Sequence, residues 1–312
     1  MRINFILLLL ALNLPAAYGA QCPDKGLQLQ VLGSGGSSLS PGRAGPGYII
    51  WYQGHARILV DIGPGTAIRF RETGARFADL ETLLLTQVDS AHTADLAALM
   101  SSAVNGDRLR PLPIYGPVAS KTTPSTVSFV RSLFDQKRGA FRDLGSLVSP
   151  LGTQTFKLKP HNTSVVSKKK VTGENKNTNI PVFSNAIFKI YNFNASDKKG
   201  EKLGWLIKAG GKNIVLIGDA QPNTKNLKDF TNNADILVVH HAIPESGPNS
   251  AKNNFLSPSA IGSIAYKAQT RQLVLGHRRF VTLGKEKETT AEIKSKFSGL
   301  VHFANDLDCF TP

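Results

Sequence analysis

Four polar positions, each at the end of an apolar run of the chain, carry the side chains best suited to chemistry. His92 lies in the turn that follows an apolar run, and Asp219, the pair His240 and His241, and His277 end three later runs. Side chains that leave successive strands meet at one edge of a sheet, where loops on a rigid scaffold build active sites. Imidazoles and carboxylates together form the ligand set of a zinc-like divalent ion. We therefore expect a metal site.

The elements that must position these residues follow a mixed α/β pattern. Residues 27–33 alternate like a half-buried strand, and the apolar runs at 47–52 and 57–63 flank a short turn, as in a hairpin. A second hairpin over 204–219 is expected to turn at Gly210 and Gly211. Further predicted strands cover 80–86, 234–242 and 270–277, and predicted helices cover 93–104, 124–134, 257–268 and 289–297.

The first 19 residues have the features of a secretory signal peptide. Arg2 precedes the unbroken apolar stretch 5–12, and Ala17 and Gly19 are spaced like the small residues before a cleavage site. The apolar core is about half of the ~20 residues that a membrane-spanning helix needs, which disfavours a retained anchor. We expect an exported protein, periplasmic or secreted, with a signal peptide at 1–19, one domain over 20–312 and no membrane span after processing.

Only two cysteines are present, and they lie near opposite ends of the exported chain. Cys22 and Cys309 form a disulfide in an oxidising compartment or remain two unrelated thiols. We expect the disulfide, because export brings the chain into a compartment where such bridges persist.

The charge of the chain is strongly positive and unevenly distributed. The formal net charge is +15, and twelve lysines face three acidic residues between positions 157 and 212. The lysines at 168–170 lie in a polar stretch without periodicity, which indicates an exposed flexible loop. Such a patch suits an anionic surface or nucleic acid. No aromatic side chains are interleaved for base stacking, which argues against a nucleic-acid partner and favours a solvated loop.

Seven blocks of the sequence, in order, resemble the metallo-β-lactamase superfamily, with the branch of exported, ribonuclease-Z-like hydrolases the most similar. The blocks are "VLGSGGSSLSPGRAGPGYII", "LVDIGPGT", "LLLTQVDSAHTADL", "IVLIGDAQ", "ADILVVHHAIPE", "LVLGH" and "FANDLDCF". The resemblance covers nearly all of the exported chain. It implies an α/β fold, the αββα four-layer sandwich, with a dinuclear metal site along one edge. It also implies that Asp61, in the second block, is a structural hydrogen-bond acceptor.

The metal-binding motif of this family is degenerate here. The family pattern His-x-His-x-Asp-His reads Gln87, Asp89, Ala91 and His92 in this sequence. The next family histidine falls in a stretch that offers only asparagines, such as Asn194. The resemblance therefore implies that the first of the two metal sites is lost.

The residues that match the second metal site are retained. His92, Asp219 and His277 align with family ligands, and Asp89 could stand in for a lost histidine as a carboxylate ligand. The secondary candidates for this site are Gln87 and His240. We expect at most one divalent ion, Zn, Mn or Fe, or none.

Two functions follow from these observations. One is an exported hydrolase with an altered, at most mononuclear site that acts on an ester, lactone or phosphodiester. The other is a catalytically inactive pseudoenzyme that binds an anionic ligand or partner in the remnant cleft. A nuclease role has the positive charge in its favour and the signal peptide against it. Arg278, beside His277, is a candidate contact for the carboxylate or phosphate of an anionic small molecule, or is surface charge. The sequence indicates no oligomeric state.

Overall fold

A computed structural model describes residues 22–38, 40–163, 180–196, 201–222, 224, 227 and 231–312 of the chain. The signal peptide predicted at 1–19 and the loop predicted around 168–170 lie outside the described residues. Within the described ranges, no helix combines the length and the apolarity needed to cross a bilayer.

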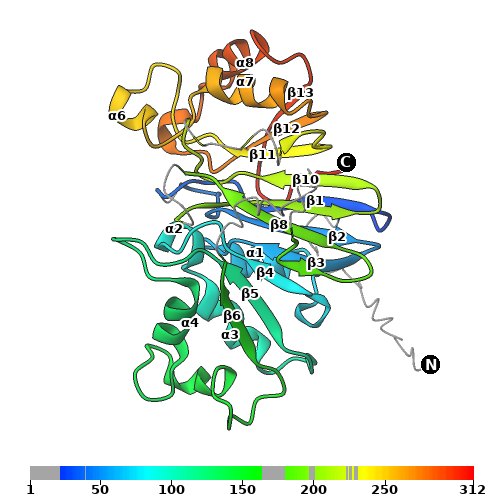
Figure 1. The fold of residues 1–312 in the computed structure, drawn as a ribbon, viewed down its shortest axis with the longest axis vertical. Helices are drawn as coiled ribbons and strands as arrows, with labels where there is room; N and C mark the ends of the chain where they lie inside the picture. The colour runs from blue at the N-terminus through cyan, green and yellow to red at the C-terminus, as the bar shows by residue number, and fades with distance from the viewer. Residues whose placement is uncertain are drawn as a thin grey trace, which may run out of the picture.

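Two seven-stranded sheets lie face to face and form the centre of the molecule (Figure 1). The strand order is β14-β1-β2-β3-β4-β5-β6 in one sheet and β13-β12-β11-β10-β9-β8-β7 in the other. In each sheet one half is antiparallel and the other is parallel, with the parallel halves formed by β3 to β6 and by β10 to β13. The last strand, β14, joins the first sheet by pairing with β1.

The bounds of the elements follow the chain order. The strands are β1 Leu27–Gly33, β2 Gly47–Tyr52, β3 His55–Val60, β4 Thr82–Leu84, β5 Leu112–Gly116, β6 Leu158–Asn162, β7 Phe183–Ser184, β8 Lys189–Asn194, β9 Leu203–Ala209, β10 Lys212–Leu216, β11 Ile236–His240, β12 Gln272–Gly276, β13 Leu300–Phe303 and β14 Cys309–Phe310. The helices are α1 Thr66–Glu72, α2 Ser90–Thr93, α3 Leu96–Ala103, α4 Thr126–Phe134, α6 Asn249–Lys252, α7 Pro258–Lys267 and α8 Glu286–Lys294, with 3-10 turns η1 Phe77–Asp79, η2 Arg142–Leu147 and η3 Phe280–Thr282.

Three layers of apolar side chains hold the sheets and helices together. Because side chains alternate along a strand, the central strands bury both faces. In β2, Tyr48 and Ile50 face the layer between the sheets, whereas Ile49 and Trp51 face the helices. One outer layer packs the first sheet against α1, α3 and α4, and the other packs the second sheet against α7 and α8, as Figure 1 shows. The fold is the predicted four-layer αββα sandwich.

The second predicted hairpin is confirmed by β9 and β10. The two strands pair in antiparallel register through the turn at Gly210 and Gly211. Both glycines have positive φ angles, 55° and 74°, which side chains with a Cβ disfavour.

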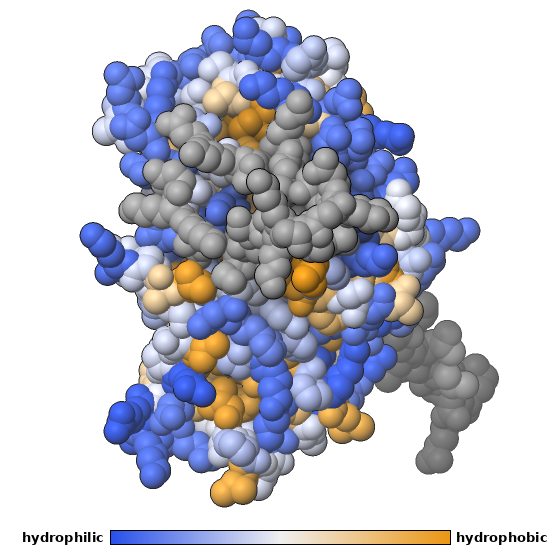
Figure 2. Space-filling model, viewed as in Figure 1, coloured by the Kyte–Doolittle hydropathy of each residue, from blue (hydrophilic) through white to orange (hydrophobic). Residues whose placement is uncertain are grey.

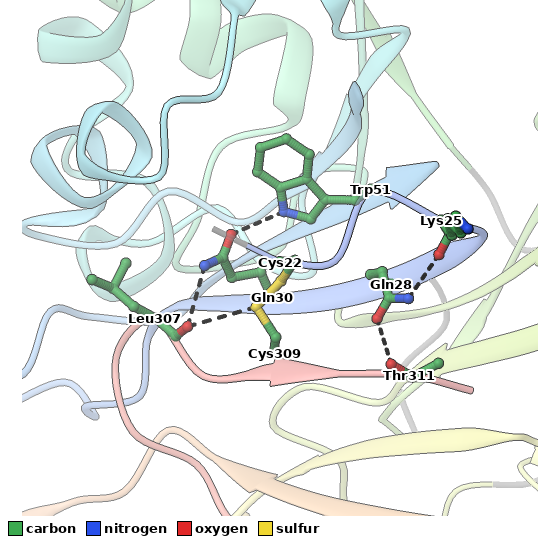
Figure 3. Close-up of a disulfide and its surroundings, with 8 residues drawn as sticks. All are labelled: Cys22, Lys25, Gln28, Gln30, Trp51, Leu307, Cys309 and Thr311. Carbon is green, nitrogen blue, oxygen red and sulfur yellow. Dashed lines mark hydrogen bonds between the residues drawn. A yellow bond between two sulfur atoms is a disulfide. The ribbon is translucent and has the colours of Figure 1, made fainter. Parts of the chain in front are cut away.

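The predicted disulfide between Cys22 and Cys309 is present and closes the edge of the first sheet (Figure 3). It joins the segment before β1 to β14. Gln30 of β1 supports this edge, accepting a hydrogen bond from Trp51 Nε1 at 2.9 Å and donating one to the carbonyl of Leu307 at 3.2 Å. The covalent link therefore holds a strand of only two residues in the sheet.

The surface seen in Figure 2 is largely hydrophilic, with apolar side chains in separate patches. Scattered exposed apolar residues are normal for a folded protein. Burial is concentrated in the three layers between and outside the sheets.

Candidate metal centre

Three histidines and one aspartate converge at one edge of the sandwich. His92 lies in α2, while Asp219, His240 and His277 come from the ends of the neighbouring parallel strands β10, β11 and β12. One ligand atom of each residue lies within 4.8 Å of those of the other three. All four side chains are buried, and the rings of His240 and His277 stack with their centroids 4.4 Å apart. The expected convergence of strand ends at one edge is confirmed.

Asp89 fixes the orientation of His92. It is the N-cap of α2, and its Oδ1 accepts hydrogen bonds from the backbone N–H of His92 at 3.0 Å and from Nδ1 at 2.6 Å. The proton on Nδ1 leaves Nε2 to face the cluster. The Asp89 carboxylate lies beside the ring rather than within the group of four ligand atoms. A ligand role for Asp89 stays a prediction, and the geometry supports an orienting role.

Asp219 links the residues around it through both of its carboxylate oxygens. Oδ1 accepts a hydrogen bond from His240 Nδ1 at 2.8 Å, and Oδ2 accepts one from Gln87 Nε2 at 3.0 Å. Burial raises the pKa of Asp219, but the adjacent His277 and His240 outweigh burial and hold this pKa well below its usual range. Asp219 therefore carries the negative charge of the cluster.

The pKa values of His92 and His277 are shifted in opposite directions. Burial lowers the pKa of His277 to about 3, so its ring is neutral at pH 7. Burial also lowers the pKa of His92, but the hydrogen bond to Asp89 and the nearby carboxylates of Asp61 and Asp219 outweigh it and raise this pKa to about 9. A metal ion binds only the neutral ring, so an ion and a proton compete for Nε2 of His92.

The backbone around the cluster is held by a buried carboxylate and a special conformation. Asp61 accepts hydrogen bonds from the backbone N–H of Thr86 at 2.8 Å and from its hydroxyl at 2.7 Å, which fixes the chain just before Gln87. This is the acceptor role that the sequence predicts for Asp61. Asp61 and His277 have positive φ angles of 56° and 49°, and such strain tends to persist at functional sites.

A cavity of about 350 Å³ opens beside the cluster. His92, Asp219 and His277 line it, together with the side chains of Lys202 and Phe255. The Lys202 ammonium lies 3.5 Å from the backbone carbonyl of Asp219 and 5.6 Å from the centre of the Phe255 ring. The remaining lining residues are mainly polar: Ser37, Gln87, Val88, Asp89, Ala91, Ser120, Thr122, Thr123 and Glu201. The cavity is therefore suited to a polar ligand.

Arg278 and His241 point away from this cavity. Arg278 is buried, pairs with Glu286 and lies 5.3 Å from the centre of the Phe303 ring. His241 leaves β11 on the face opposite to His240 and contacts the Thr289 hydroxyl of α8 at 3.1 Å. The cation that lines the cavity is Lys202, so this arrangement gives no support to the predicted substrate contact from Arg278.

Two features of the site go beyond the expected ligand set. His240 belongs to the group of four ligand atoms, although the sequence made it only a secondary candidate. Its position at the end of β11 is equivalent to the positions of Asp219 and His277. This is the signal that could have identified His240 as a primary ligand candidate. Lys202 lies in a lysine-rich stretch where no pattern distinguishes one lysine from another.

Comparisons with known proteins agree with this geometry. Ribonuclease Z from Clostridium beijerinckii is 23% identical over 282 residues, which cover 80% of this chain and 87% of the relative. No protein-family model matches the chain. The metallo-β-lactamase-fold protein YhfI from Bacillus subtilis superposes with a TM-score of 0.66 at 18% identity, over 92% of this chain and 100% of its own. The chain has the metallo-β-lactamase fold and is distantly similar to ribonuclease Z.

Solved structures of two further proteins share the fold of this chain. Human tRNase Z, short form, has a TM-score of 0.67 at 16% identity, over 91% of this chain and 98% of its own. Zn²⁺-bound PqqB from Methylobacterium extorquens has a TM-score of 0.62 at 14% identity, over 91% of this chain and 100% of its own. At these identities the likeness establishes the fold.

The donor set fits a divalent ion on chemical grounds. Three imidazoles and one carboxylate are ligands that zinc, manganese and iron accept. Nδ1 of His277 is buried without a hydrogen-bond partner in the described part of the chain, which is costly for a polar atom unless something binds there. Ligand atoms around zinc lie about 3.4 Å apart in a tetrahedron. The four side chains would therefore move closer together around an ion.

Proposed function

We propose that this protein is a hydrolase that holds one divalent ion with His92, Asp219, His240 and His277 and cleaves an anionic small-molecule ester or phosphodiester. The observation that carries the proposal is the buried group of four ligand atoms beside a polar cavity. A purely structural cluster would not need access to a cavity of about 350 Å³. The ribonuclease Z relatives support a hydrolytic reaction.

Lys202 supports an anionic substrate, in a cavity that Asp89, Glu201 and Asp219 also line. Lys202 pairs with no carboxylate in the described part of the chain, and its ammonium lies near the backbone of Asp219. A phosphate or carboxylate bound there would be neutralised by this ammonium next to the ligand cluster. Ser120, Thr122 and Thr123 also line the cavity, and their hydroxyls can donate hydrogen bonds to an anion.

Individual residues would have distinct roles in the proposed hydrolysis. A divalent ion held by His92, Asp219, His240 and His277 would polarise the scissile group and lower the pKa of water. Asp89 holds the His92 ring so that Nε2 faces the cluster. Lys202 orients the substrate through its negative group. Ala91 offers no carboxylate at the position where the family motif has an aspartate, so we expect slow turnover.

Metal-dependent hydrolysis by the full chain tests this proposal. The protein is incubated with one equivalent of Zn²⁺, Mn²⁺ or Fe²⁺ and assayed with bis(4-nitrophenyl) phosphate, 4-nitrophenyl butyrate and an aliphatic lactone. We expect hydrolysis that is lost with chelator and in His277→Ala, and retained in the control His161→Ala at an exposed histidine. Activity that survives in His277→Ala would contradict the proposal.

A pseudoenzyme is the second candidate, because Gln87 and Ala91 replace residues of the family motif. It predicts no metal-dependent turnover, together with binding of inorganic phosphate that Lys202→Met abolishes. Because both candidates bind an anion at Lys202, the presence or absence of metal-dependent turnover separates them, and calorimetry with phosphate tests the anion site that they share.

We further propose that the protein is exported. The disulfide between Cys22 and Cys309 supports an oxidising compartment. Intact mass of the protein recovered from its native host should show removal of residues 1–19 and no free thiol. A mass that retains the first 19 residues would refute processing.

A further inference from the structure

Gln87 places its side-chain nitrogen between two of the four ligand residues. Nε2 of Gln87 lies 3.2 Å from Nε2 of His92 and 3.0 Å from Oδ2 of Asp219, and all three side chains are buried. Gln87 therefore bridges two of the four candidate ligand residues.

The contacts fix which way the amide of Gln87 points. An ionised carboxylate only accepts hydrogen bonds, so the group facing Asp219 must be the NH₂. In the neutral form of His92, which is the form that a metal ion binds, the single ring proton is directed from Nδ1 at Asp89, at 2.6 Å, and Nε2 has a lone pair. With His92 neutral, the two hydrogens of the amide nitrogen therefore face two candidate metal-ligand atoms, Nε2 of His92 and Oδ2 of Asp219.

This arrangement competes with an ion bound through Nε2 of His92 and Oδ2 of Asp219. Bonds from zinc to nitrogen or oxygen are about 2.0–2.2 Å long, so an ion that uses these two atoms must take the lone pairs that the amide hydrogens now face. Gln87 also lines the cavity, so its side chain has room to swing out. The ion and the amide are alternatives for the same lone pairs.

We infer that Gln87 is a built-in competitor for the metal ion, which lowers the affinity of the site and limits loading to conditions of abundant metal. The inference rests on the proposed metal site. In the metal-free protein, the amide keeps Asp219 and His92 hydrogen-bonded and the pocket formed. Binding must first break these two hydrogen bonds, one of them to a charged group.

Metal titration of the full chain tests this role. Zn²⁺ and Mn²⁺ affinities are measured by competition with a chromogenic chelator for the wild type and for Gln87→Met, which keeps the length of the side chain but removes the amide. Because Gln87→Met has no amide hydrogen bonds to break, we expect it to bind metal roughly tenfold to hundredfold more tightly than the wild type. The control is Gln136→Met at an exposed glutamine remote from the cavity, which should bind as the wild type does.

The possible outcomes are distinct. Tighter binding by Gln87→Met supports competition. Weaker binding would overturn it and make Gln87 a ligand through its amide oxygen, and equal binding would also overturn it. If neither protein binds either metal, the proposed metal site itself fails.

A second measurement guards against a folding defect. With chelator present, Gln87→Met should unfold at a lower urea concentration than the wild type, because His92 and Asp219 lose their partner. With saturating Zn²⁺ the difference between the two proteins should shrink or reverse. A destabilisation that is the same with and without metal would contradict the inference.

Discussion

Replacing Cys22 and Cys309 by alanine together should lower the free energy of unfolding by about 3 to 5 kcal/mol. The bridge spans a sequence separation of 287 residues. In the chain-entropy model a loop of this length is worth about 5.7 kcal/mol at 25 °C. This value is an upper bound for the loss that the double variant would show.

Two features of the structure reduce the expected loss. β14 keeps its pairing with β1 through Leu29 and Phe310, and the Thr311 hydroxyl still donates to Gln28 at 2.7 Å. Residual structure in the unfolded chain lowers the entropic gain further. We therefore expect a measured value below the model limit, with part of the loss appearing as local fraying of β14.

Urea unfolding at equilibrium is the assay. The oxidised wild type, the wild type with reductant and the double alanine variant are compared, with intact mass confirming the thiol state of each sample. The reduced wild type should agree with the variant, and the slope of free energy against urea should rise when the loop is opened, because the unfolded chain exposes more surface. Equal midpoints for oxidised and reduced protein would refute the reasoning.

Three further predictions concern the site. Asp89→Asn should weaken metal affinity by roughly ten to a hundredfold without abolishing binding, since it only orients His92; complete loss in a metal titration would instead make Asp89 a ligand. Asp61→Ala should destabilise the protein by about 2 to 4 kcal/mol in urea unfolding, because both hydrogen bonds from Thr86 lose their acceptor. Lys202→Met should raise KM for an anionic substrate about tenfold with little change in kcat, and an unchanged KM would contradict anion recognition by this residue.

The elements at the site edge were predictable from the sequence because their periodicity is strong. The apolar runs that end at Asp219, His240 and His277 form the parallel strands β10, β11 and β12, and parallel strands bring their carboxyl ends to one edge. The strand β5 gave no such signal, since its run is short and contains Pro113.

The directions of individual side chains were less predictable. Asp89 has the spacing of a helix N-cap before His92, a local signal that explains its position better than the family motif does. Lys202 lies in a stretch without periodicity. The orientation of Gln87 depends on its contact with Asp219, which is more than 100 positions away in the sequence. Such contacts depend on the assembled fold, and no short sequence pattern encodes them.

The division of the chain between the two sheets has a consequence for its connectivity. Strands β1 to β6 end at Asn162 and β7 begins at Phe183, so among the strands of the described residues only β14 returns from the second half to the first sheet. The Cα atoms of Cys22 and Cys309 are 5.6 Å apart. A short peptide could therefore join the two ends, and new termini could be opened between β6 and β7. Every strand pairing would survive in this circular permutant, because the order of the strands in space does not depend on where the chain starts.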